Sequence, residues 1–218
     1  MTLLHYAPAT TPFLDIRYQD DDIVVVNKAS GLLSVPGKAL EHRDSVWTRL
    51  SYACPDIRVV HRLDMATSGL LVFAHNKTAQ AALQRQFERR SVGKRYVAKV
   101  AGHLPATRGA IELPMRCDWP NRPRQMVDLW EGRHALTFYQ VIGHDKLGDI
   151  VYLEPYTGRS HQLRVHMQAL GTPIRGDKFY ADPAAFAAAE RLLLHAESLA
   201  FDHPTTQQRL HFTCPAEF

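Results

Sequence analysis

The run Ile23-Val24-Val25-Val26 places the firmest limit on how this chain can fold. Consecutive β-branched residues between the acidic run 20–22 and the polar pair Asn27-Lys28 are typical of a buried strand. Residues 70–74 form a second apolar run of the same kind. Buried strands need cover from other elements, so the chain must build a sheet on which further elements pack.

Helical and strand patterns follow one another along the chain without a strict alternation. Helices are expected at 45–52 (capped by Asp44 or Ser45), 76–90 (capped by Asn76), 161–171 (capped by Ser160, with Gly171 at its end) and 184–192. Strands are expected at 94–100, at 135–142 and 150–154 around the turn 144–146, and after Leu193, with loops at 61–69 and 115–124. This order favours an α+β fold with helices packed on a mixed sheet over a doubly wound parallel sheet.

Residues 1–17 are expected to form an N-terminal arm and residues 18–218 a single domain, because no repeat, linker or change in composition divides them. The net charge of +4 is too small to identify a partner by itself. Cys54, Cys117 and Cys214 are far apart, which argues against a disulfide framework or a structural zinc site and favours a reducing cytosol. The N-terminus lacks a basic region followed by an apolar run, and no apolar stretch approaches the ~20 residues of a membrane span, so neither a signal peptide nor a membrane anchor is expected.

The segment His61-Arg62-Leu63-Asp64, followed by Thr67-Ser68-Gly69, lies in a loop between two apolar runs. Loops on a rigid scaffold often carry catalytic groups, and a carboxylate such as Asp64 can act as a nucleophile or as a general base. The alternative is a surface ion pair of Arg62 and Asp64 with a turn before the next strand. The residues alone leave both interpretations open.

A second polar segment covers residues 158–166. Arg159 and the free N–H groups at the start of the expected helix offer a site for an anion. His161 and His166 are five residues apart, so they do not share a helix face, and we expect no metal site there. A solvated polar helix face is the alternative.

Basic residues also gather beside aromatic ones, a pattern that suits RNA because cations neutralise phosphates and rings stack on unpaired bases. The set comprises Arg85, Arg89, Arg90, Lys94 and Arg95 near Tyr96, and Arg116, Arg122 and Arg124 near Trp119. A solvated helix face explains residues 85–90 nearly as well. The segment Arg122-Pro123-Arg124 is harder to explain in that way, because proline stiffens it and neither arginine has an acidic neighbour.

From Tyr18 to Phe218, the chain resembles the RluA-type pseudouridine synthases. Residues 61–69 match the catalytic signature of that family, and residues 117–123 point to one group of proteins within it. Supporting blocks in the same order are Val26-Asn27-Lys28 with Gly31-Leu32, Lys94-Arg95-Tyr96-Val97-Ala98, residues 158–166, Gly176-Asp177 with Tyr180, and Leu193-Leu194-His195-Ala196. Ala29 departs from the proline that family members usually have there. About 17 residues precede the first expected strand, too few for the S4-like RNA-binding domain of many relatives.

The resemblance implies a largely antiparallel sheet with an active-site cleft across it, and an enzyme that turns uridine into pseudouridine after the base leaves its stack. It implies that no metal or cofactor takes part, and that the targets are one or both of a 23S rRNA hairpin loop and the tRNA anticodon stem-loop. A cytoplasmic monomer without membrane contact is expected. The catalytic residues implied are Asp64, Tyr96 and Arg164, and the RNA-binding residues are His61, Arg62, Arg122, Arg124, Arg159 and His161.

Two other functions stay open at this point. A non-catalytic RNA-binding module needs Arg122 and Arg124 and can dispense with Asp64. A glycosidase needs two carboxylates across the bond that it breaks, and no second acid stands out beside Asp64.

Overall fold

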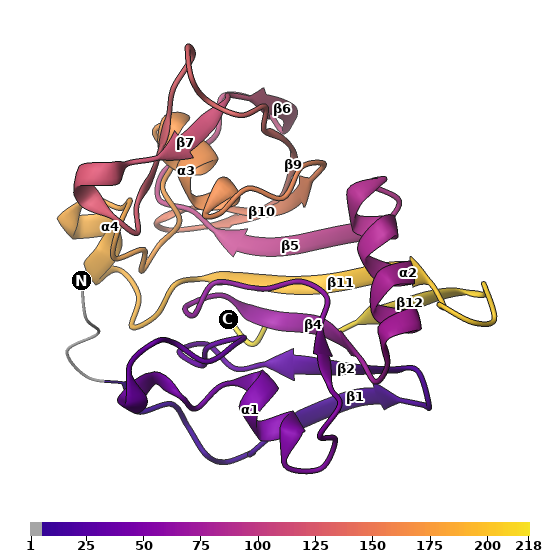
Figure 1. Ribbon diagram of the computed structural model, residues 1–218. Coiled ribbons are helices and arrows are strands. Elements are labelled where there is room, and N and C mark those ends of the chain that lie inside the picture. Colours follow the sequence, from indigo (N-terminus) through magenta and orange to yellow (C-terminus); the bar gives the residue numbers. More distant parts are fainter. Residues whose placement is uncertain (1–5) are drawn as a thin grey trace. The chain divides into compact units, whose positions relative to one another are not determined.

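The computed structural model describes residues 6–218, whose backbone forms two compact units (Figure 1). Residues 6–94 and 196–217 make up the terminal unit, and residues 95–195 with Phe218 make up the central unit. Of the expected arm, residues 1–5 lie outside the described residues, and residues 15–17 belong to the first strand, β1 (Asp15–Gln19). The single domain over residues 18–218 stays a prediction.

The terminal unit is built on the two apolar runs. The first run lies in β2, where residues 23–25 have no exposed surface, and the second lies in β4, which is buried along its whole length. β2 pairs antiparallel with β1 on one side and with β4 on the other, and β11 follows β4 in the sheet. The strands are β1, β2 (Ile23–Lys28), β3 (Arg58–Val59), β4 (Ser68–Ala74), most of β11 (Leu194–Asp202) and β12 (Arg209–Thr213).

The helices of the terminal unit begin at the expected caps. The Ser45 hydroxyl accepts from the Thr48 N–H at the start of α1 (Val46–Ser51), and the Asn76 side chain accepts from the Ala79 N–H at the start of α2 (Lys77–Glu88). α2 buries Ala79 and Leu83 in the same core as β2 and β4. A short 3-10 turn, η1 (Leu40–His42), precedes α1.

The central unit contains an antiparallel sheet in the order β5-β10-β9-β6. Its strands are β5 (Gly93–Lys99, entering from the terminal unit), β6 (Arg108–Glu112), β9 (Leu136–Asp145) and β10 (Gly148–Pro155). The expected hairpin is present, but its strands extend through residues 144 and 145, which we had placed in the turn. Gly148 closes the turn at φ +151°, where a Cβ would lie 2.4 Å from the carbonyls of Val100 and Gly102. The α+β fold with a mixed, largely antiparallel sheet is confirmed.

Both helices of the central unit differ from expectation at one end. α3 (Gln162–Ala169) has His161 at its N-cap position, with φ +54° and no capping hydrogen bond from its side chain, and Ser160 is not the cap. Gly171 ends it at φ +76°, as expected. α4 (Pro183–Ala187) stops well before residue 192. Beyond α4 the backbone bonds to distant residues: the Leu193 N–H donates to the Arg175 carbonyl, and the Leu193 carbonyl accepts from the Lys99 N–H.

The expectation of an irregular, exposed loop at 115–124 is wrong for residues 115–117, which form a strand, whereas residues 118–124 lie outside the strands. β7 (Met115–Cys117) and β8 (Gln125–Val127) form a two-stranded antiparallel ribbon, the β7–β8 ribbon, with the 3-10 turn η2 (Trp119–Asn121) at its tip. Met115 is 2% exposed, so burial of this side chain and pairing across the ribbon outweigh the breaker residues at the tip. Within residues 6–218, the helices are all too short or too polar to cross a membrane.

Candidate active site

Asp64 lies in the segment between β3 and β4, and its side chain is half-buried. Its carbonyl accepts from the Thr67 N–H at 3.1 Å, so the chain turns at once towards β4. On the other side, the Ser34 hydroxyl donates to the Leu63 carbonyl at 2.8 Å and accepts from the Leu63 N–H at 3.1 Å. The backbone on both sides of Asp64 is therefore held by hydrogen bonds.

A buried lysine also anchors this segment. Lys28, the last residue of β2, is 1% exposed. Its Nζ donates to the carbonyls of Met65 (2.9 Å), Leu32 (2.7 Å) and Ala29 (2.9 Å). The Gly31 N–H donates to the same Met65 carbonyl at 2.9 Å. Hydrogen bonds from a cation are stronger than neutral ones, so Lys28 ties the loop after β2 firmly to the residue that follows Asp64.

His61 and Arg62 differ in their surroundings. The His61 ring stacks on Phe87, with 4.6 Å between ring centroids, and its Nε2 accepts from the Val72 N–H at 3.1 Å. Burial, and then the charge of Lys94, lower the pKa of His61 to about 3, so the ring is neutral near pH 7. Arg62 is exposed and can reach a ligand.

Arg164 and Asp177 form a buried two-point ion pair. Nε of Arg164 lies 2.7 Å from Oδ2 of Asp177, and Nη2 lies 2.6 Å from Oδ1. Oδ1 also accepts from the N–H groups of Phe179 (2.9 Å) and Tyr180 (3.2 Å). A bidentate pair with this backing fixes the plane of the guanidinium group.

Aromatic rings surround this ion pair. The ring centroids of Phe179 and Tyr180 lie 5.3 and 5.1 Å from the guanidinium carbon of Arg164. Nδ1 of His161 lies 2.6 Å from the Tyr180 hydroxyl, and the His161 ring stacks on Phe179. Arg124, at the end of the β7–β8 ribbon, donates to the Phe179 carbonyl. Three expected site residues, Arg124, His161 and Arg164, thus share one cluster.

The other polar residues of segment 158–166 connect α3 to its surroundings. Nε of Arg159 donates to the His134 carbonyl at 2.9 Å, and its backbone N–H donates to the buried Gln162 side chain. His166 has no exposed surface, its Nδ1 lies 2.9 Å from the Thr137 hydroxyl, and burial lowers its pKa. In the part of the chain that the structure describes, no group of three His, Cys, Asp or Glu side chains is arranged to hold a metal ion.

The remaining expected residues lie on β5 and on the β7–β8 ribbon. Tyr96 is half-buried in β5, opposite Leu153 of β10. Arg122 is exposed at the ribbon tip, and its guanidinium carbon lies 4.7 Å from the ring of Trp119. Asp64, His61 and Arg62 belong to the terminal unit and the other expected residues to the central unit, so a pairing of Asp64 with Arg164 stays a prediction.

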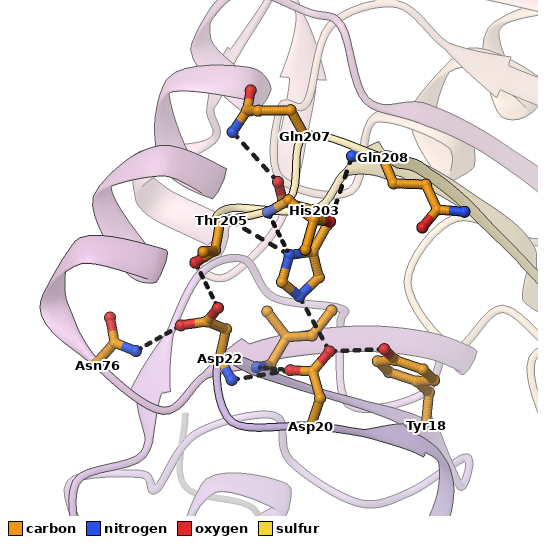
Figure 2. A network of polar contacts seen from close by, with 10 residues as sticks. Tyr18, Asp20, Asp22, Asn76, His203, Thr205, Gln207 and Gln208 are labelled. Carbon is orange, nitrogen blue, oxygen red and sulfur yellow. Dashed lines mark hydrogen bonds and ion pairs between the residues drawn. The ribbon is translucent and has the colours of Figure 1, made fainter.

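A second polar cluster, shown in Figure 2, joins three turns of the terminal unit. Asp20 accepts from the Tyr18 hydroxyl at 2.7 Å and lies 3.0 Å from Nε2 of His203. Asp22 accepts from the Thr205 hydroxyl at 2.5 Å and from the Asn76 amide at 2.9 Å. These two hydrogen bonds lower the pKa of Asp22. The cluster connects the β1–β2 turn to the start of α2 and to the β11–β12 turn, which is a structural role.

Lys28, Ser34 and Asp177 are not among the site residues expected from the sequence. Lys28 and Asp177 do stand in blocks that carried the family resemblance, and Lys28 comes two residues after the apolar run 23–26. Ser34 has no distinguishing signal, because its partner Leu63 is 29 residues away.

Comparisons with known proteins identify the family of the chain. The model of the family described as RNA pseudouridylate synthase matches residues 22–169. The chain is 53% identical over 220 residues to the dual-specificity RNA pseudouridine synthase RluA of Escherichia coli (strain K12), covering 100% of both. It is 50% identical over 218 residues to the protein of that name from Vibrio cholerae serotype O1, covering 100% of this chain and 89% of the relative.

A solved structure, Human RNA Pseudouridylate Synthase Domain Containing 1, matches with a TM-score of 0.80 at 32% identity, over 97% of this chain and 87% of that one. Human RNA Pseudouridylate Synthase Domain Containing 4 matches with a TM-score of 0.74 at 26% identity, over 92% of this chain and 88% of that one. The resemblance inferred from residues 61–69 and the supporting blocks is confirmed.

Proposed function

The chain belongs to the RNA pseudouridylate synthase family, and on that premise we propose that it isomerises particular uridines of structured RNA with Asp64 as its essential carboxylate. The observation that carries the proposal is the match to dual-specificity RluA over the whole chain. The structure adds support, because Lys28 and Ser34 hold the backbone on both sides of Asp64.

The reaction rearranges one nucleoside and needs no co-reactant. The N1–C1′ bond of uridine breaks, the base turns, and C5 bonds to C1′. The proton on C5 leaves and N1 gains one, so atoms and electrons balance. Asp64 acts as an ionised carboxylate that attacks the sugar, attacks the base, or removes a 2′ proton.

Arg164 and Tyr96 assist this carboxylate in the proposal. Arg164 pairs with Asp64 in this proposal and supplies a positive charge beside the carboxylate. Its orientation is set in advance by the bidentate pair with Asp177. Tyr96 packs against the flipped base and takes the C5 proton. No metal or cofactor takes part in any of these steps.

The proposed RNA contacts lie around these residues. Arg62 enters the RNA and holds the target base out of its stack, which is easiest in a loop where little pairing is lost. Arg122 and Arg124 bind phosphates from the ribbon tip. His61, Arg159 and His161 complete the set, although His61 contributes through packing on Phe87. We propose a 23S rRNA hairpin loop and the tRNA anticodon stem-loop as the substrates, which fits the dual specificity in the relatives' name, and a cytoplasmic monomer as the enzyme.

Asp64→Asn tests the proposal directly. We expect unchanged RNA affinity, because the shape of the side chain is kept, and no detectable pseudouridine. Asp56→Asn is the matched control, because Asp56 is an exposed aspartate of the same unit, and it should retain full activity. Pseudouridine formation by Asp64→Asn at the wild-type rate would refute the catalytic role. Pseudouridine mapping in total RNA from cells with and without the gene identifies the substrates.

A further inference from the structure

The turn that follows β8 presents two large apolar side chains to solvent. Trp130 is 95% exposed and Leu129 is 69% exposed. In the described part of the chain, no aromatic ring or cation stacks on Trp130. A tryptophan in this position contributes little to the stability of the fold, since burial is what makes such a side chain stabilising.

The turn itself is tightly constructed. Oδ1 of Asp128 accepts from the N–H groups of Trp130 and Glu131, both at 2.9 Å. Oδ2 of the same carboxylate accepts from Nε of Arg116 at 2.5 Å. The backbone hydrogen bonds from Glu131, and then Arg116, lower the pKa of Asp128 to about 2, so it is ionised at every pH of interest. The carboxylate therefore fixes the backbone on which the Trp130 side chain is mounted.

Two further contacts close the turn. The Gly132 N–H donates to the Asp128 carbonyl at 3.1 Å, and a Cβ on Gly132 would lie 2.1 Å from that oxygen, so only glycine fits. Arg133 and Met115 exchange two backbone hydrogen bonds, at 2.8 and 2.9 Å. A rigid turn that exposes an aromatic ring is preorganised for binding, because little conformational entropy is lost when a ligand meets it.

The charges near the turn indicate the ligand. Arg122, Arg124 and Arg133 are exposed on or beside the β7–β8 ribbon, and Arg122 already stacks on Trp119. A protein-binding hot spot is usually ringed by contacts that exclude water. Trp130 stands between the exposed Leu129 and the exposed charges of Glu131 and Arg133, so little on this turn shields the ring from water. Exposed rings interleaved with arginines are the arrangement that binds unpaired bases and phosphates.

We propose that Trp130 is a base-stacking site, which binds an unpaired base of the substrate RNA other than the uridine that reacts. The proposal rests on the proposed function for the identity of the RNA. It assigns the turn 128–133 to RNA recognition, with Asp128 and Gly132 as residues that position the ring.

The experiment compares Trp130→Ala and Trp130→Phe on an RNA in which the wild-type enzyme forms pseudouridine. Stacking of one base predicts roughly 5- to 100-fold weaker RNA binding for Trp130→Ala, and a much smaller loss for Trp130→Phe. The rate at saturating RNA should stay unchanged, because the ring contacts another base. Phe186→Ala, an aromatic residue 46% exposed on α4, is the matched control and should bind as the wild type does.

Salt dependence separates stacking from charge. Trp130→Ala should leave the slope of log affinity against log salt unchanged, whereas Arg133→Gln should reduce it by about one. Unchanged RNA affinity for Trp130→Ala beside an active wild type would overturn the stacking site and leave the enzyme function intact. Unchanged RNA affinity with loss of a protein ligand would assign the ring to that protein instead. A wild type that forms no pseudouridine in any RNA would count against the proposed function itself.

Discussion

Replacing Lys28 with methionine removes a charge without creating a cavity, so it isolates what this ammonium group does for the segment of Asp64. The Met65 carbonyl keeps its hydrogen bond from Gly31, and the Ala29 carbonyl keeps a longer one from the Leu32 N–H at 3.4 Å. The Leu32 carbonyl loses a donor at 2.7 Å. Lys28→Met therefore affects the three carbonyls unequally.

The expected loss of stability follows from these contacts. A buried carbonyl left without a donor costs about 1–3 kcal/mol, and the two weakened sites add a smaller amount. Removing a buried charge recovers part of its desolvation free energy. We expect the free energy of unfolding to fall by about 2–3 kcal/mol, which leaves a folded protein because domains of this kind have about 5–15 kcal/mol in total.

For Lys28→Met, we expect the rate of pseudouridine formation to be affected more strongly than the stability. Met65 follows Asp64 directly, so loosening its carbonyl shifts the carboxylate, and a displacement of about 1 Å can reduce a rate by about 100-fold. Urea unfolding and single-turnover pseudouridine formation measure the two effects. Lys77→Met, at an exposed lysine of the same unit, should change stability by less than about 0.5 kcal/mol. Wild-type stability together with a wild-type rate for Lys28→Met would refute the reasoning.

Two further changes test the buried polar groups. Asp177→Asn should destabilise the protein by about 3 kcal/mol in urea unfolding, because Arg164 keeps its charge and loses its carboxylate, and adding Arg164→Met should cost little more. Additive effects of the two changes would contradict the pair. The pKa of His61 is lowered to about 3, so the folded protein keeps the ring neutral while the unfolded chain protonates it below its ordinary value of 6.5. The free energy of unfolding should therefore fall by about 1–2 kcal/mol between pH 7 and pH 5. In His61→Gln it should fall less, because glutamine does not titrate. Equal losses in the two proteins would exclude His61 as the source.

Local signals predicted the parts of the fold that local forces determine. Ser45 and Asn76 cap their helices within three residues of sequence, and the apolar runs of β2 and β4 are buried as their composition indicates. The start of α3 was not predicted, because His161 at the N-cap position has a partner 19 residues away: its ring nitrogen lies 2.6 Å from the Tyr180 hydroxyl. The end of α4 was also predicted wrongly, because helix propensity after Ala187 does not reveal the hydrogen bonds of Leu193 with distant backbone.

The candidate site shows the same division. The motif that contains Asp64 can be recognised in the sequence. The groups that hold its backbone in place, Lys28 and Ser34, cannot. Lys28 donates to the carbonyl of Met65, which is 37 residues away in the sequence. No hydrophobic periodicity around Lys28 or in the loop after it predicts this contact. Arg164 could be named from its family block, but its buried carboxylate partner could be found only from the fold.

The split of the terminal unit between residues 6–94 and 196–217 bears on how the protein is made. A ribosome releases β1, β2 and β4 first, then every residue of the central unit, and β11 and β12 last. Asp20 and Asp22 cannot form their contacts with His203 and Thr205 until those residues, 183 positions later in each case, have been made. Until then β4 lacks its neighbour β11, although residues 73 and 74 pair with β3, and unpaired apolar edges promote aggregation. A nascent chain paused before residue 194 therefore exposes the part of β4 that β11 covers in the folded protein.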